Sequence, residues 1–246
     1  TTFPGYYAMI ANAHMAEFGT KEEQLAMVAV KNHYYGNLNP FAHMQKEITL
    51  DKAITSFTVA HPLKLYDCSL ITDGAAAVLL ASEERAKAIS KKPVWFAGLA
   101  LATDTMRMGE RNSLTSILAT REAAKTAYKM AGIGPADIDV ATVHDCFTIA
   151  EIVAYEDLGF CEKGEGGKLI EAKETYVGGR IPVNVDGGLK SKGHPLGATG
   201  VSMAIEITKQ LRGEAGERQV KDAEIGLAHN VGGTGQVVAI HIFRRE

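Results

Sequence analysis

The 246 residues carry 26 Lys and Arg against 29 Asp and Glu, and the net charge of −3 gives no reason to expect nucleic acid or an acidic membrane surface as a partner. No apolar run approaches the roughly 18 to 20 residues that a membrane helix needs, and no signal-peptide pattern opens the chain. The three cysteines lack the spacing of a disulfide framework or a zinc site. We therefore expect an intracellular, cytoplasmic protein with no metal.

The first third of the chain is predicted to be helical at its start and irregular afterwards. Apolar residues at helical spacing predict helices over residues 6–17 and 20–35. Thr20 and Glu23, three residues apart, have the capping-box spacing that begins a helix. Residues 41–66 are mixed and polar, which is typical of a long excursion from a domain rather than of a free-standing domain.

From residue 73 onward, strand and helix patterns alternate. The residues that follow Ser82 are predicted to form a helix capped by that serine, and Gly132 is the expected end of another helix. Residues 161–180, rich in Gly and Glu, are expected to form a loop. The alternation, with a hairpin at its end, predicts an α/β fold with a mixed sheet. The predicted strands are residues 75–81, 94–101, 139–144, 225–229 and 236–243, and the predicted helices are residues 113–131, 149–158 and 201–211.

Residues 186–200 form the stretch most suggestive of chemistry. Glycine is used where the backbone must take a positive φ or approach another group closely, and here glycines surround His194 just before a helix. Pro195 restricts the local chain direction further. This pattern favours a histidine positioned for catalysis, although a glycine-rich loop with an incidental histidine remains the alternative.

Two other loops carry polar groups at predicted strand ends. Residues 144–147 (His-Asp-Cys-Phe) follow one strand, and residues 229–233 (His-Asn-Val-Gly-Gly) end another. Sites in open α/β sheets collect where such loops converge. A cysteine at a helix N-terminus near histidines has its thiol pKa lowered, so Cys146 is a candidate for proton transfer. The alternative is a buried, inert cysteine.

Taken in this order, His-Asp-Cys-Phe, Gly-His-Pro and His-Asn-x-Gly-Gly resemble the motifs of the thiolase superfamily, in particular the sterol-carrier-protein-type and archaeal acetoacetyl-CoA thiolases. The resemblance extends to Asn39-Pro40, to residues 69–77 and to residues 140–243. Better-known thiolases have Cys-x-Gly as the last motif, where this chain has His229-Asn230. In the branch that it resembles, the acid/base cysteine is the one that matches Cys146.

The resemblance implies acyl transfer between acyl-CoA thioesters, which forms or cleaves a 3-ketoacyl-CoA such as acetoacetyl-CoA through a cysteine acyl-enzyme. His194 would activate the nucleophile and donate a hydrogen bond to a thioester oxygen. His144, with Asn230 or His229, would polarise an oxyanion or order a water. Preorganised donors of this kind are each worth roughly 2.7 to 4 kcal/mol in the barrier.

Coenzyme A is implied as a substrate. Lys190 and Lys192 are candidate partners of its phosphates, with ordinary solvated lysines as the alternative. Gly193 and Gly233 are candidate positions where the backbone approaches the bound molecule.

The family's nucleophilic cysteine has no counterpart here. Cys68 matches a residue on the family's path back into the first half of the fold, and Cys161 lies in the Gly/Glu-rich stretch. The chain is therefore expected to be the later part of a thiolase. Residues 1–92 would be part of the loop region and the end of the N-terminal half, and residues 93–246 the complete C-terminal half, a mixed sheet with helices on both faces.

Such a half-fold leaves an apolar face uncovered, so we expect a first-half partner, on the same or another chain, or a tight homo-oligomer. The alternatives are a thiolase-like subunit that binds or scaffolds without a nucleophile, and a same-fold aldolase. The Cys146 sulfur is expected within about 4 Å of a His194 ring atom or of the space between His194 and His229, facing an open pocket. Asp145 is expected to cap backbone of its loop.

Overall fold

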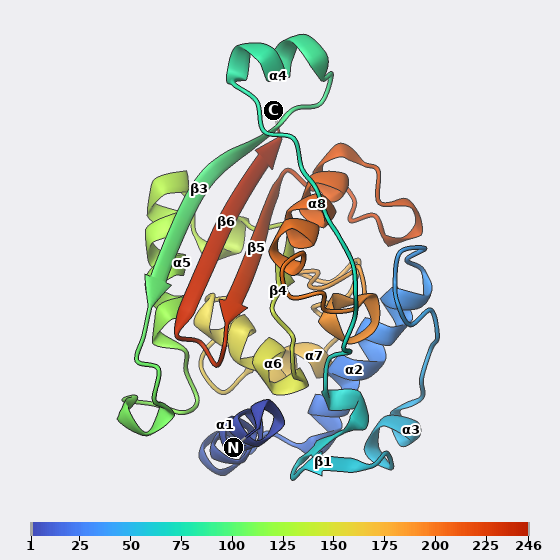
Figure 1. Cartoon of the computed structure of the whole chain (residues 1–246), viewed down its shortest axis with the longest axis vertical. Coiled ribbons are helices and arrows are strands. Elements are labelled where there is room, and N and C mark those ends of the chain that lie inside the picture. The colour runs from blue at the N-terminus through green and yellow to red at the C-terminus, as the bar shows by residue number, and fades with distance from the viewer. Residues whose placement is uncertain (1, 246) are drawn as a thin grey trace.

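The protein, a computed structural model, is described over residues 2–245 (Figure 1). Its helices are α1 (Phe3–Phe18), α2 (Glu22–Asn37), α3 (Leu50–Ile54), α4 (Glu83–Ile89), α5 (Leu118–Ala131), α6 (Thr148–Asp157), α7 (Gly166–Glu171) and α8 (Thr199–Arg212), with a π-helical turn at Gly188–Lys192. Its strands are β1 (Thr58–Ala60), β2 (Leu63–Lys64), β3 (Val94–Thr103), β4 (Val140–Val143), β5 (Ile225–Gly232) and β6 (Val237–Arg245). Within this range no helix is long and apolar enough to cross a bilayer.

A four-stranded mixed sheet organises the second part of the chain. Its order is β3-β6-β5-β4, with β5 antiparallel to β6, β6 antiparallel to β3, and β4 parallel to β5. A single parallel bridge between Ala141 and Val183 adds a short fifth element beside β4. The predicted α/β fold with a mixed sheet and a terminal hairpin is confirmed.

Helices cover both faces of this sheet (Figure 1). Successive residues of β5 demonstrate it, because side chains alternate between the faces of a strand. His229 contacts Thr120 of α5 on one face, and a Cβ on Gly200 of α8 would meet the Asn230 amide on the other. Gly98 of β3 lets the strand approach α5, since a Cβ there would lie 2.4 Å from the Ala127 carbonyl oxygen.

The N-terminal helices pack mainly on the core of the second part of the chain, although α2 and α3 also share a small apolar cluster of their own. Tyr7, Leu25 and Val28 belong to the same apolar cluster as Ile240 of β6. Gly19, at φ 74°, ends α1. The capping prediction for Thr20 is wrong: the N-cap of α2 is one residue later, because the Thr20 hydroxyl is hydrogen-bonded to the buried His14 ring at 2.7 Å.

The predicted strand at residues 75–81 does not form. Among the described residues, the backbone groups of residues 70–81 make no backbone hydrogen bond. The segment runs past α8 to α4 at the end of the molecule (Figure 1). Its apolar side chains are open to solvent, with Leu79 84% and Leu80 68% exposed. A strand needs an adjacent strand to satisfy its N–H and C=O groups, and residues 2–245 supply none there.

Two other predicted bounds change. Helix α5 begins at Leu118 rather than at residue 113, because the carboxylate of Asp157 accepts hydrogen bonds from the Ile117 N–H and the Ser116 hydroxyl just before it. The predicted loop at residues 161–180 contains the short helix α7. Ser82 caps α4 and Gly132 ends α5 in the left-handed conformation, as predicted.

Candidate active site

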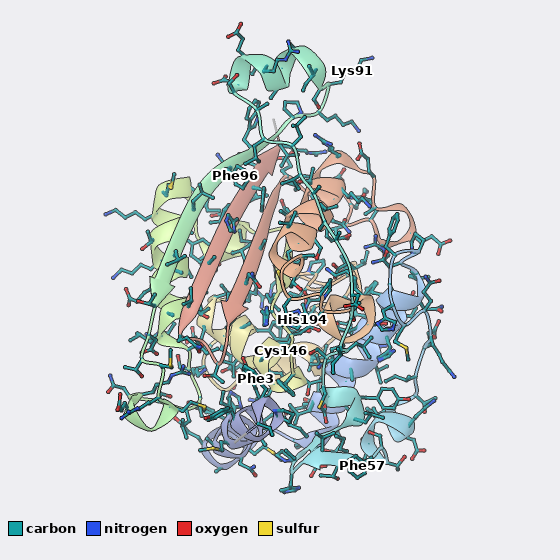
Figure 2. The ribbon with its side chains drawn as sticks, in the orientation of Figure 1. Phe3, Phe57, Lys91, Phe96, Cys146 and His194 are labelled. Carbon is teal, nitrogen blue, oxygen red and sulfur yellow. The ribbon has the colours of Figure 1, made fainter. Side chains whose placement is uncertain are left out.

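A pocket of about 500 Å³ lies beyond the carboxyl ends of β4 and β5. Because these two strands are parallel, the loops that follow them open at the same edge of the sheet. Figure 2 shows Cys146 and His194 close together in this view, with Phe3 of α1 beside them. The residues that matter for chemistry in its lining are Phe3, His144, Cys146, His194, Asn230 and Gly233.

His194 is held as a neutral base. Its Nδ1 lies 2.7 Å from the Thr199 hydroxyl, and that hydroxyl donates its own proton to the Pro195 carbonyl at 3.1 Å. Since the hydroxyl proton is already used, Nδ1 must be the donor of the pair, and Nε2 keeps its lone pair. Partial burial and the neighbouring Lys192 and Lys190 charges lower the pKa of His194. The imidazole can therefore take a proton from a group in the pocket.

His144 and Asn230 form the second pair. His144 Nδ1 lies 2.9 Å from the Asn230 carbonyl oxygen, an acceptor, so Nδ1 carries the ring proton. The rings of His144 and His194 meet edge to face with centroids 5.0 Å apart. Burial, and then the His194 charge, lower the pKa of His144 to about 3. This histidine is neutral at working pH, and its Nε2 can accept a hydrogen bond from a water.

Cys146 lines the same pocket as both histidines. The expected lowering of its thiol pKa is wrong: burial raises the pKa of Cys146 to about 12, despite opposing contributions from a hydrogen bond with Tyr7 and from the Lys190 charge. Helix α6 begins two residues after the cysteine, and desolvation outweighs its N-terminus. The thiol is therefore protonated at rest. Its approach to within about 4 Å of a His194 ring atom remains a prediction.

His229 is not brought to this pocket. It is buried against α5, with Nε2 at 3.0 Å from the Thr120 hydroxyl, and its Nδ1 has no hydrogen-bond partner among the described residues. Burial lowers its pKa to about 3. The reason is the alternation of side chains along β5, which sends Asn230 to the pocket and His229 to the opposite face.

The two candidate phosphate lysines are engaged within the protein. Lys190 is buried, donates to the Asp67 carbonyl oxygen, and has its ammonium 6.0 Å from the centre of the Phe147 ring. Lys192 forms an ion pair with the buried carboxylate of Asp186. These contacts fix the shape of the His194 loop and leave neither ammonium free for a phosphate in the pocket.

The two candidate glycines have different surroundings. Gly193, at φ 112°, passes so close to Thr72 that a Cβ would lie 2.7 Å from its hydroxyl oxygen. Gly233, at φ 62°, lines the pocket, and its carbonyl oxygen accepts a hydrogen bond from Tyr7 at 3.2 Å. Gly193 thus permits the course of the loop, while Gly233 presents backbone to the pocket.

A buried polar network behind the pocket escaped the sequence-based prediction. Asn32 of α2 donates to Asp145 at 2.8 Å and to Glu151 at 2.7 Å, and Lys31 forms an ion pair with Glu151. Asp145 also accepts from the Leu189 N–H at 2.7 Å, so it caps backbone of the His194 loop rather than of its own loop. Burial and the nearby Glu151 raise the pKa of Asp145 to about 7.

The signal for this network was present but ambiguous. Glu151 stands in an apolar helix, and Lys31-Asn32 lies on the helix that carries Leu25 and Val28. Charged residues are seldom fully buried without partners, but the sequence does not show which distant residues those partners are. Tyr7 and Phe3 escaped for the same reason, because α1 gives no local sign that it borders a site.

The remaining two cysteines lie outside the pocket. Cys68 is half-buried next to Phe147, and its thiol donates to the Lys64 carbonyl at 3.4 Å. Burial raises the pKa of Cys161 to about 12. Within residues 2–245 no group of three or more His, Cys, Asp or Glu side chains is arranged to hold a metal ion.

Comparisons with known proteins agree with the motifs. The sequence model of the family described as thiolase C-terminal domain-like matches residues 100–245. An acetyl-CoA acetyltransferase of Methanothermobacter thermautotrophicus is 52% identical over 244 residues, which are 99% of this chain and 64% of that protein. Sterol carrier protein 2 of Bos taurus is 41% identical over 96% of this chain and 44% of its own length.

Among solved structures, the Ltp2-ChsH2(DUF35) aldolase superposes with a TM-score of 0.90 at 28% identity, over 99% of this chain and 64% of that one. The chain thus spans less than two thirds of the length of each of these relatives.

Proposed function

Because the chain belongs to the thiolase C-terminal domain-like family, we propose that it is the later part of an acyl-CoA:acyl-CoA C-acyltransferase that forms or cleaves a 3-ketoacyl-CoA such as acetoacetyl-CoA. The observation that carries this proposal is the convergence of Cys146, His194 and the His144–Asn230 pair on one pocket. The name of the archaeal relative supports acetyl as the transferred group.

His194 would activate the nucleophile. Its unprotonated Nε2 takes the proton of a cysteine thiol that we place in the preceding part of the complete protein. The imidazolium that results can donate a hydrogen bond to a thioester oxygen as negative charge develops there. Thr199 holds the ring in the tautomer that this role requires.

Cys146 would be the acid/base. In the cleavage direction, its thiol gives a proton to the α carbon as the carbon–carbon bond breaks, and the thiolate then takes the proton of incoming coenzyme A. The raised pKa of Cys146 keeps the thiol protonated at rest, which is the state that cleavage starts from. The condensation direction runs the same two transfers in reverse.

His144 and Asn230 would order a water. His144 Nε2 accepts one of the water's protons, and the other proton is left to point at an oxyanion in the pocket. The carbonyl oxygen of Asn230 fixes the His144 tautomer. His229 has no part in this proposal, because it lies on the far face of β5.

Coenzyme A would bind as a substrate. The proposal assigns the backbone at Gly233 to the thioester end of the molecule, because this residue lines the pocket, and Gly193 to the course of the neighbouring loop. It assigns the phosphates to neither Lys190 nor Lys192, since both ammonium groups are bound within the protein.

The likeness to an aldolase structure makes a retro-aldol reaction the second candidate. A retro-aldol cleavage needs a base for the hydroxyl group of its substrate but no thiol. A thiol that lines the pocket beside two histidines therefore favours acyl transfer. A subunit that only binds or scaffolds would need neither.

The test uses the complete protein with acetoacetyl-CoA and coenzyme A, and follows the loss of acetoacetyl-CoA absorbance. Cys146→Ala should lower turnover by about 10² to 10⁴, while acylation of the nucleophile by acetyl-CoA stays visible as added mass. The matched control is Cys161→Ala, because Cys161 does not line the pocket, and this variant should turn over normally.

Normal turnover of Cys146→Ala would refute the assignment. Cleavage of a 3-hydroxyacyl-CoA without cleavage of acetoacetyl-CoA would show an aldolase, and neither reaction would show a binding or scaffold subunit.

The same proposal assigns residues 1–92 to the loop region and the end of a first half, and residues 93–246 to the second half. Segment 70–81 supports it, because an exposed apolar stretch whose backbone makes no hydrogen bond to the backbone of the described residues could pair as a strand with a sheet of the first half. In the complete protein the amide hydrogens of residues 75–81 should be strongly protected from exchange. Rapid exchange there would contradict the assignment.

The proposal also includes a homo-oligomer of the complete protein, and light scattering would show whether one forms.

A further inference from the structure

Asp145 stands between two residues of the pocket but does not line the pocket itself. His144 and Cys146 flank it in the turn at residues 144–147, and both of them line the pocket. The alternation of side chains along β4 thus continues into this turn, and the Asp145 carboxylate lies behind the pocket, fully buried. The reaction proposed above gives it no part. A buried carboxylate needs hydrogen-bond partners, and these partners indicate its role.

The first partner of Asp145 is the His194 loop (residues 186–194). The Oδ1 atom of Asp145 accepts a hydrogen bond from the Leu189 N–H at 2.7 Å. Gly188 lets the loop come this close, since a Cβ there would lie 2.4 Å from the Asp145 Oδ2 atom. Within residues 2–245, the bond from Leu189 is the only hydrogen bond between this loop and the turn at residues 144–147.

The second partner holds the carboxylate itself in place. Asn32 of α2 donates to Asp145 Oδ2 at 2.8 Å and to Glu151 of α6 at 2.7 Å. Glu151 also forms an ion pair with Lys31, the neighbour of Asn32 on α2. Both oxygens of Asp145 are therefore bound, one by α2 and one by the His194 loop. Groups that lie behind a site and are themselves fixed can set the position of the side chains in front of them.

The other bonds of the His194 loop do not reach the turn at residues 144–147. The Ser191 hydroxyl donates to the Met44 carbonyl at 2.6 Å, and the Met44 N–H donates to the Ser191 carbonyl at 2.9 Å. Lys192 pairs with Asp186 inside the loop. These contacts hold the loop to itself and to a distant segment. The bond to Asp145 is what relates the loop to the turn that carries Cys146.

We propose that Asp145 is a positioning residue that fixes the separation of Cys146 and His194 by joining their two backbone segments through the Leu189 N–H. The catalytic meaning of this role rests on the proposed function, in which both side chains act on one substrate. Figure 2 shows the two side chains close together. On the pocket side, the rings of His144 and His194 meet with centroids 5.0 Å apart, and Asp145 joins the same two segments from behind.

The experiment measures steady-state cleavage of acetoacetyl-CoA by the complete protein. Asp145→Ala removes the acceptor of the Leu189 N–H. Because a displacement of about 1 Å at a catalytic group can cost about 10²-fold, kcat should fall by about 10²-fold. KM should stay within about threefold, since Asp145 does not line the pocket. Asp145→Asn keeps an oxygen for the Leu189 N–H, but the weaker bond of a neutral acceptor should lower kcat by about three- to tenfold.

Asp157→Ala is the matched control. The Asp157 carboxylate is also buried, and it accepts from the Ile117 N–H at 2.6 Å and from the Ser116 hydroxyl at 2.8 Å, but it does not line the pocket. This variant should lower the urea midpoint as Asp145→Ala does and leave kcat unchanged. An unchanged kcat in Asp145→Ala, or an equal fall in Asp157→Ala, would overturn the proposal. If Asp145→Ala does not fold, an unchanged kcat in Asp145→Asn would overturn it.

A second measurement needs no turnover. Amide hydrogen exchange, followed by peptide mass spectrometry, should be faster across residues 188–194 in Asp145→Ala and unchanged there in Asp157→Ala. Faster exchange in Asp145→Ala, together with a wild-type protein that cleaves no acetoacetyl-CoA, would remove the proposed function and leave the joining of the two segments by Asp145 standing. Normal cleavage by both the wild type and Asp145→Ala would do the reverse.

Discussion

Two apolar stretches of this chain differ in burial and in backbone pairing. Strand β6 lies between β3 and β5, and its Ile240 and Ile242 are fully buried. Residues 75–81 have an equally apolar sequence but lie exposed, and their backbone groups find no hydrogen-bond partner in the backbone of the described part of the chain. The contrast teaches that β-propensity describes how well a residue fits a half-buried sheet surface. Neighbouring strands decide whether that surface exists.

The largest effect should come from the contrast between an ion pair in the buried core and an exposed ion pair in α4, the helix that follows residues 75–81. Glu151→Ala leaves the Lys31 ammonium buried without its carboxylate and should lower the free energy of unfolding by about 3 to 5 kcal/mol. Glu83→Ala removes the exposed partner of Lys87 in α4 and should have no measurable effect. Urea unfolding followed by circular dichroism compares the two variants. Equal losses would mean that the regions are equally well packed.

Leucine and isoleucine truncations sharpen the same contrast. Ile240→Ala should cost about 2 to 5 kcal/mol, because it opens a cavity in the core. Leu79→Ala should change the stability of this chain by no more than about 0.5 kcal/mol. In the complete protein, a first-half sheet would raise the Leu79→Ala cost to the Ile240 range. If the cost stays small there, the segment has no strand partner.

A smaller effect on stability should come from the protonation of the buried His229 as the pH falls. The pKa of His229 falls from 6.5 to about 3 on folding, so below pH 6.5 the unfolded chain binds a proton that the folded chain does not. Stability must therefore fall as the pH drops from about 6.5 toward 3, by up to about 1.4 kcal/mol per pH unit.

His229→Gln should remove that share of the slope between pH 7 and 5 in urea unfolding. Asp145 contributes with the opposite sign, because its pKa is raised, but it is present in all the proteins compared. If His229→Gln leaves the slope unchanged, the buried ring carries its proton in the folded state as it does in the unfolded state, and the prediction is wrong.

Sequence patterns predicted the second half well because its signals are local. Helix α5 stops at the predicted Gly132, and the strands β3, β5 and β6 lie where apolar runs predicted them. Residues 75–81 carried an equally good local pattern and were predicted wrongly, since the deciding information is a strand elsewhere.

The site was predicted to the level of loops. His144, Cys146, His194 and Asn230 do line one pocket, but His229 faces away because neighbours on a strand point in opposite directions. The burial that raises the Cys146 pKa depends on distant residues that pack over it. Motif spacing predicts which turn a residue occupies, but only the packed fold determines how deeply that turn is buried from solvent.

The contacts of Lys31 with Glu151 and of Asn32 with Asp145 restrict the length of helix α2. These neighbours on α2 reach Glu151 and Asp145, and successive residues of a helix are about 100° apart around its axis. Deleting one residue between the start of α2 and Lys31 would turn either the front of the helix or this pair out of phase with its partners. Insertions should be accepted in the loop after α2 but not within α2 itself. The length of the helix therefore fixes the direction in which Lys31 and Asn32 point, and a change of sequence must preserve that direction.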